Sequence, residues 1–221
     1  MPTPLSPDLT IHGGGNLYPK YTTKNPIARL LVDRFLATLL DLADRTKVQE
    51  VHEVGCGEGF LSVTLAERGF SVRGSDLSSG AIARARRQAA TREHAPTFRV
   101  ADLYDLAPEP DGAELVVCCE VLEHLPDPVR ALRILARLAC PFLIVSVPRE
   151  PLWRALNLAR GHYWRELGNT PGHLQHWSTR DFLALLREHV EVLEHRTPIP
   201  WTFALCRTRS IPGGRARHHQ M

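Results

Sequence analysis

The chain has 221 residues, of which 43% are hydrophobic and 23% charged, and its formal net charge is +3. This composition is ordinary for a globular protein that buries a core, and the small charge does not indicate a basic nucleic-acid-binding or membrane surface. No stretch approaches the ~20 apolar residues of a spanning helix, and no signal peptide is recognisable. Five cysteines without zinc-type spacing favour reduced, mostly buried thiols, so we expect a cytoplasmic protein.

The first part of the chain predicts an arm followed by a helix. Residues 1–24 show no periodic pattern, whereas Asn25-Pro26 is typical of a helix start and apolar residues recur at helical spacing to about residue 44. Strands and helices then alternate. Strands are predicted at 48–54, 71–75, 97–101, 114–120 and 142–147, and helices at 59–68, 78–90 and 128–139. Short apolar strands separated by helices indicate an α/β fold, a doubly wound and mainly parallel sheet with helices on both faces.

Residues 148–178 interrupt this alternation. The segment is rich in aromatic residues, histidine and arginine, and it follows the end of a strand, where open α/β sheets bind ligands. We therefore expect a lid or substrate wall there, followed by a helix at 179–189 and strands at 190–195 and 202–207. The predicted division is an N-terminal arm and capping helix at 1–44, a cofactor-binding domain at 45–208 that carries the insert, and a basic flexible tail at 209–221.

The first predicted strand runs into a glycine-rich turn, EVGCGEG, at residues 53–59. No Lys-Ser/Thr pair follows, which excludes the phosphate loop of nucleoside triphosphatases, and the GxGxG spacing is one residue short of the dinucleotide GxGxxG pattern. Glu53 would repel a pyrophosphate but suits a cationic ligand. Asp76 follows Gly59 by 17 residues at the end of the next strand, where a carboxylate can accept hydrogen bonds from ribose hydroxyls.

These motifs resemble the class I S-adenosylmethionine (SAM)-dependent methyltransferases, over roughly residues 45–207. The resemblance implies SAM as cofactor and a seven-stranded sheet whose last strand is antiparallel. The resemblance implies that the first motif and Glu53 lie at the methionine half of the cofactor, and that Asp76 binds its ribose. It also implies that Asp102 binds the adenine amine, and that the EVLEHL segment after the fourth strand lies at the methionine half. The cofactor-binding residues that we expect are Glu53, Gly55, Cys56, Gly57, Gly59, Asp76, Leu77, Ala101, Asp102, Leu103, Glu120, Val121 and, through a cation–π contact from the arm, Tyr21.

The expected reaction is methyl transfer to an oxygen or nitrogen atom of a small-molecule or lipid-like acceptor held under the insert. Methyl transfer is an in-line displacement, so the protein mainly aligns the acceptor, but a hydroxyl or amine also needs a base to remove its proton. Candidate catalytic residues near the mouth of the crevice are His124, His173 and His176. No metal is assigned, and the sequence does not identify the acceptor.

Three other interpretations remain open. Glu120, Glu123, His124 and His173 match the pattern of metal-dependent methyltransferases that act on the 2′-hydroxyl of RNA, where two carboxylates and two histidines hold Mg²⁺ or Mn²⁺. The low net charge makes nucleic acid the less favoured acceptor. A SAM-binding module without catalysis is the second alternative. An NAD-linked oxidoreductase is the third, and the GxGxG spacing and Glu53 disfavour it.

Overall fold

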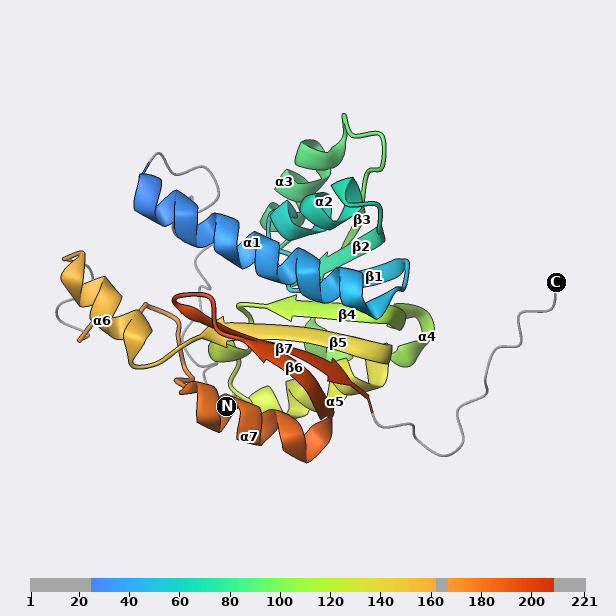
Figure 1. Cartoon of the computed structure of the whole chain (residues 1–221). Coiled ribbons are helices and arrows are strands. Elements are labelled where there is room, and N and C mark those ends of the chain that lie inside the picture. The colour runs from blue at the N-terminus through green and yellow to red at the C-terminus, as the bar shows by residue number, and fades with distance from the viewer. Residues whose placement is uncertain (1–24, 162–166, 209–221) are drawn as a thin grey trace, which may run out of the picture.

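The computed structural model describes residues 25–161 and 167–208, which form one seven-stranded sheet in the order β3-β2-β1-β4-β5-β7-β6 (Figure 1). The strands are β1 (Glu50–Val54), β2 (Ser71–Asp76), β3 (Thr97–Val100), β4 (Ala113–Cys119), β5 (Ala139–Pro148), β6 (Glu191–Arg196) and β7 (Trp201–Arg207). Only β7 runs against its neighbours, pairing antiparallel with β5 and with β6. The doubly wound, mainly parallel sheet with an antiparallel seventh strand is thus confirmed.

Helices cover both faces of this sheet. The α-helices are α1 (Pro26–Thr46), α2 (Phe60–Glu67), α3 (Ser79–Ala89), α4 (Pro108–Asp111), α5 (Pro128–Leu138), α6 (Leu152–Ala159) and α7 (Thr179–His189), and the 3₁₀ turns are η1 (Leu103–Asp105) and η2 (Leu122–His124). α1, α2 and α3 lie on one face, and α5 and α7 on the other (Figure 1). Over the described residues, no helix is both long and apolar enough to cross a bilayer.

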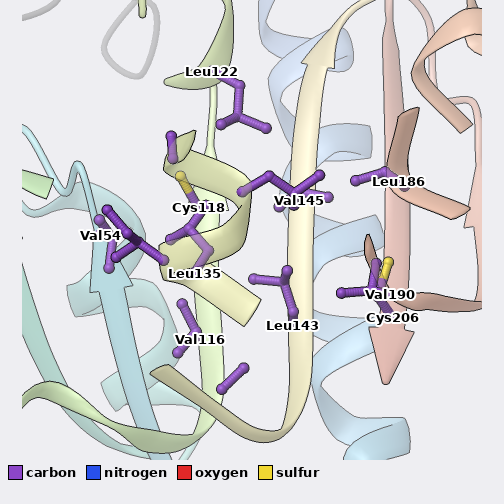
Figure 2. Close-up of a cluster of buried hydrophobic side chains, with 14 of the residues drawn as sticks. Val54, Val116, Cys118, Leu122, Leu135, Leu143, Val145, Leu186, Val190 and Cys206 are labelled. Atoms are coloured by element: carbon purple, nitrogen blue, oxygen red, sulfur yellow. The ribbon is translucent and has the colours of Figure 1, made fainter. Parts of the chain in front are cut away.

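The apolar central strands are explained by burial on both faces. Along β4, Val116 and Cys118 pack in the core formed with α5 and α7, which Figure 2 shows in close-up, whereas Val117 and Cys119 pack in the core on the α1 side. Successive side chains of a strand point to opposite faces, so a strand between two helical layers needs apolar residues at every position. Cys118 and Cys119 are therefore small core residues, as their apolar context predicts.

Helix starts follow their capping residues closely. The Asn25 side chain accepts hydrogen bonds from the backbone N–H groups of Ile27 and Ala28 and begins α1, as expected. This helix ends at Thr46, two residues beyond the expected end, where Lys47 adopts a left-handed conformation (φ 58°). Apolar residues that recur along α1, among them Phe35 and Leu39, pack against the sheet.

The insert contains a helix that the sequence pattern did not predict. α6 projects beyond the ends of β4 and β5 (Figure 1), and its buried Asn157 donates to the backbone oxygen of Gly168 (2.9 Å) and to Thr170 Oγ1 (3.2 Å). Trp153 Nε1 donates to the same Thr170 hydroxyl at 2.9 Å. Helix and following loop are therefore tied into one packed unit beside the carboxyl edge of the sheet.

Candidate functional site

The glycine-rich turn leaves the carboxyl end of β1 in a conformation that favours glycine. Gly55, Gly57 and Gly59 all have positive φ, at 78°, 53° and 80°. A Cβ atom at Gly55 would overlap the Val121 side chain, and one at Gly59 would lie 2.7 Å from the Phe98 ring. A Cβ at Gly57 would meet nothing within 4 Å. The outer glycines thus allow close packing, whereas the middle one borders open space.

Asp76 joins the glycine turn to the next strand. Its Oδ2 atom accepts from the backbone N–H of Gly57 at 2.8 Å, and Oδ1 accepts from that of Ser78 at 2.8 Å, at the start of α3. Each carboxylate oxygen has two lone pairs, so these bonds orient the carboxylate without exhausting its capacity to accept from a ribose. The neighbouring Leu77 side chain is 57% exposed, an apolar surface beside a polar anchor.

The predicted adenine-binding residues follow β3. The Ala101 backbone N–H donates to the backbone oxygen of Asp76 (3.0 Å), which brings the ends of β2 and β3 together. The Asp102 carboxylate accepts from the Tyr104 N–H at 2.8 Å and caps the η1 turn. The Leu103 side chain, in contrast, is buried in the α5–α7 core, so this residue can face a ligand only through its backbone.

Glu53 and Cys56 lie beneath the turn. Glu53 is 2% exposed, and its carboxylate accepts from the Ser62 hydroxyl of α2. The Cys56 side chain packs with Phe98 and Ile82, and burial, with the nearby Glu53 and Asp76 charges, raises the pKa of its thiol far above the usual range. Cys56 is therefore a neutral packing residue that can offer a cofactor only its backbone.

The end of β4 carries a second charged group. Glu120 has a left-handed backbone (φ 58°), and its N–H donates to the backbone oxygen of Ser146 on β5 at 3.0 Å. Its carboxylate accepts hydrogen bonds from Trp201 Nε1 at 2.7 Å and from Ser146 Oγ at 3.4 Å. Trp201 begins β7, 81 residues further along the chain, and no sequence pattern pointed to it.

Two of the three predicted catalytic histidines lie together. The ligand atoms of Glu123, His124 and His173 fall within 4.8 Å of one another, and the two imidazole rings meet edge to face at 4.8 Å. His124 Nδ1 lies 2.9 Å from the Gly172 carbonyl oxygen, which can only accept, so this nitrogen carries the proton and Nε2 carries the lone pair. His176 lies outside this group and contacts the Asn169 side chain.

Backbone bonds fix the position of this group. The N–H groups of Leu174 and Gln175 both donate to the Glu123 carbonyl oxygen, at 2.8 and 3.0 Å. The Trp153 ring stacks on His173 at 6.0 Å between ring centres. Glu123 is 1% and His173 9% exposed, whereas His124 is exposed, so the group opens toward solvent on one side.

One predicted cofactor residue lies outside the described structure, and one cavity lies away from the carboxyl edge of the sheet. Tyr21, the predicted cation–π partner, belongs to residues 1–24 and so lies outside the described residues. A cavity of about 470 Å³, lined among others by Gln49, Arg73 and His94, opens at the amino ends of β1, β2 and β3. It lies at the opposite edge of the sheet from the glycine turn.

Comparison with known proteins agrees with this geometry. A family model described as a methyltransferase domain matches residues 52–142. The ubiquinone biosynthesis O-methyltransferase of Nitrosospira multiformis is 38% identical over 103 residues, 46% of this chain and 43% of that protein. The protein of the same name from Alkalilimnicola ehrlichii is 32% identical over 152 residues, covering 62% of this chain and 61% of that protein. The chain thus spans about half the length of these curated relatives.

Solved structures share the fold. The magnesium protoporphyrin IX methyltransferase of Synechocystis, crystallised with bound SAH, superposes with a TM-score of 0.66 at 22% identity, covering 85% of this chain and 89% of that one. The strand order, the glycine turn with its Asp76 anchor and the matched family model lead to one assignment. Residues 52–142 thus match a methyltransferase domain, and the described sheet has the fold of class I SAM-dependent methyltransferases.

Proposed function

We propose that this protein is an enzyme that transfers the methyl group of SAM to an oxygen atom of a small-molecule acceptor. The bond between Gly57 and Asp76 carries the proposal, because it builds an open glycine turn and a ribose-accepting carboxylate into one site. The curated relatives, named O-methyltransferases, support an oxygen acceptor.

The cofactor is proposed to lie across the carboxyl ends of β1, β2 and β4. The residues that would hold it are the glycine turn, Asp76 at the ribose, Asp102 beside the base, and Glu120 with Val121 at the methionine half. Bound SAM supplies an electrophilic methyl group on a sulfonium. The chain's own task is to align the acceptor in line with that group and to keep water out.

His124 is the proposed base. Its Nδ1 proton is held by the Gly172 carbonyl, so the lone pair on Nε2 can take the proton of an acceptor hydroxyl. The exposed ring stands beside the insert, where an acceptor can enter. His173 packs edge to face on it and fixes its orientation.

The acceptor is proposed to be lipid-like. The N-terminal part of α1 and all of α6 extend past the carboxyl edge of the sheet, on either side of the approach to it (Figure 1). Ile27 and Leu30 on α1 are 71% and 51% exposed, and Leu174 in the insert is 57% exposed. Such exposed apolar side chains favour an apolar partner at this entrance.

A specific observation favours a second candidate, in which a divalent cation assists the reaction. A carboxylate and two imidazoles within 4.8 Å of one another form a donor set that transition metals accept. A bound cation would lower the pKa of an acceptor hydroxyl. This set consists of Glu123, His124 and His173, because the Glu120 carboxylate is engaged by Trp201 instead.

Two measurements test the function. Calorimetric titration is expected to show SAM binding but no NAD binding. Asp76→Ala is expected to abolish SAM binding, whereas Asp105→Ala, at an exposed position, is expected to leave SAM binding unchanged. Incubation with methyl-labelled SAM and pools of phenolic, lipid and RNA acceptors is expected to label the phenolic or lipid pool. NAD binding without SAM binding would refute the proposal, labelling of RNA would refute the small-molecule acceptor, and SAM binding without any labelling would favour a non-catalytic module.

A further inference from the structure

We propose that Trp201 is a positioning residue that aims the Glu120 carboxylate at the charged methionine half of SAM. The inference rests on the proposed function and adds a residue from the last strand of the sheet to the cofactor site. Neither the glycine turn nor the family model, which ends at residue 142, includes Trp201.

The backbone of Glu120 shows that its placement is imposed by its surroundings. A glutamate at φ 58° lies in the left-handed region that side chains with a Cβ atom rarely adopt. Such a conformation persists where neighbouring contacts determine it, and these cluster at functional sites. Here the contact is the Glu120 N–H bond to the fully buried Ser146 of β5. This bond and the left-handed backbone together fix the path of the chain where β4 ends.

Trp201 sets the direction of the carboxylate. The 2.7 Å bond from its Nε1 to Glu120 Oε2 pairs a neutral donor with an anion, and such charge-assisted bonds are stronger than neutral ones. Trp201 is 5% exposed, so the donor side of this bond is buried. Among aromatic side chains, only tryptophan combines this ring area with an N–H donor at its edge.

The indole itself is held from two sides. Phe35 of α1 meets it edge to face at 4.9 Å, and Trp153 of α6 packs against it at 6.0 Å. These two contacts fix the orientation of the indole ring and hence the direction in which its N–H donates. Trp153 also stacks on His173, so a series of rings connects the Glu120 carboxylate with the histidine group of the proposed acceptor side.

The place of Glu120 relative to the glycine turn identifies the part of the cofactor that it contacts. Glu120 directly precedes Val121, whose side chain packs so closely on Gly55 that no Cβ fits there. Asp76 anchors the opposite, ribose side of the same turn. A carboxylate on the Gly55 side faces the half of SAM that carries the sulfonium and the ammonium. The negative carboxylate attracts these positive groups, and SAM has no phosphate that the carboxylate would repel.

Calorimetric titration of SAM and of 5′-methylthioadenosine tests the inference. The second ligand has the same nucleoside but neither the sulfonium nor the amino-acid portion. Trp201→Phe keeps the ring and removes the donor, whereas Glu120→Gln removes the charge. Both variants are expected to bind SAM about tenfold more weakly or worse and to bind 5′-methylthioadenosine within about twofold of the unmodified protein.

Trp177→Phe is the matched control, because Trp177 is a half-buried insert tryptophan that packs on Phe182 and makes no bond to Glu120. It is expected to change neither affinity. Equal losses for both ligands in the Trp201 or Glu120 variant, or no loss for SAM, would overturn the inference. An unmodified protein that binds neither ligand would overturn the proposed function instead, and circular dichroism of each variant separates both outcomes from misfolding.

Discussion

The backbone N–H of Gly57 donates to the Asp76 carboxylate across 2.8 Å, and this one bond joins the turn after β1 to the end of β2. The same carboxylate accepts from Ser78 at the start of α3. Local stability and, under the proposed function, cofactor binding therefore depend on one side chain.

Asp76→Asn is expected to weaken both properties. Asparagine keeps the shape but has one acceptor oxygen for two backbone donors, so one N–H loses its partner, which costs about 1–3 kcal/mol. Urea denaturation is expected to show a loss in that range, and titration a loss of SAM affinity. The exposed Asp105→Asn serves as control. Unchanged stability would mean that the two backbone donors find other acceptors.

The outer and middle glycines of the turn are expected to respond differently to alanine. Gly57→Ala meets no neighbour and adds only the left-handed backbone penalty, about 1–2 kcal/mol. Gly55→Ala adds overlap with Val121 and is expected to cost about 1–3 kcal/mol more. Val121→Ala in the Gly55→Ala background should restore part of this loss in urea denaturation. A Gly57→Ala variant as unstable as Gly55→Ala would contradict the packing argument.

His52 makes stability depend on pH. Its ring is 1% exposed, donates from Nδ1 to the Asp111 carbonyl (2.7 Å) and accepts from Ser75 Oγ at Nε2 (2.9 Å). Burial lowers the pKa of His52 to about 4. Between pH 6.5 and pH 4 the His52 ring binds a proton in the unfolded chain but not in the folded protein. The contribution of the neutral His52 ring to the free energy of unfolding is therefore complete above pH 6.5. It is lost as pH falls toward 4, by about 3 kcal/mol in total.

The measurement is urea denaturation at several values between pH 7.5 and pH 4.5. His52→Gln is expected to be less stable at neutral pH and to show a flatter dependence in this window. His195→Gln, at an exposed position of β6, should keep the original slope. Identical slopes in the two variants would assign the pH dependence to other groups.

Under the second candidate function, the histidine group (Glu123, His124 and His173) is expected to bind divalent cations. Mn²⁺ at about 100 times its dissociation constant should stabilise the protein by about 2.7 kcal/mol and raise the melting temperature by about 5–11 °C. His124→Ala and His173→Ala should abolish this rise, whereas His176→Ala should retain it, because His176 lies outside the group. EDTA should reverse the effect. A rise that survives in both His124 and His173 variants would place the cation elsewhere.

Local sequence patterns predicted the strands of the sheet and the motifs at its carboxyl edge. The continuous apolar run around Val116 and Val117 follows from burial on both faces, and the Asn25 cap from its own side chain. The start of β5 at Ala139, three residues earlier than expected, depends on pairing with Ala113 of β4, which is a tertiary contact.

The contacts that finish the site are long-range and have no local signal. α6 was missed because its buried polar residue, Asn157, binds the following loop rather than the sheet. The Glu120–Trp201 pair spans 81 residues, and no spacing along the chain encodes it. The EVLEHL motif after β4 located His124, and the histidine-rich insert located His173. The grouping of the two depends on how the insert folds back.

The contact of Phe35 with Trp201 and Phe203 also has a consequence for how the protein is made. α1 leaves the ribosome before the seven described strands, yet part of the surface that covers it belongs to β7, the last described element. Until β7 has been synthesised, the apolar stripe of α1 is incompletely covered, a state that exposes nascent chains to aggregation. Release of a chain that stops short of residue 201 should therefore yield a chaperone client rather than a smaller folded enzyme.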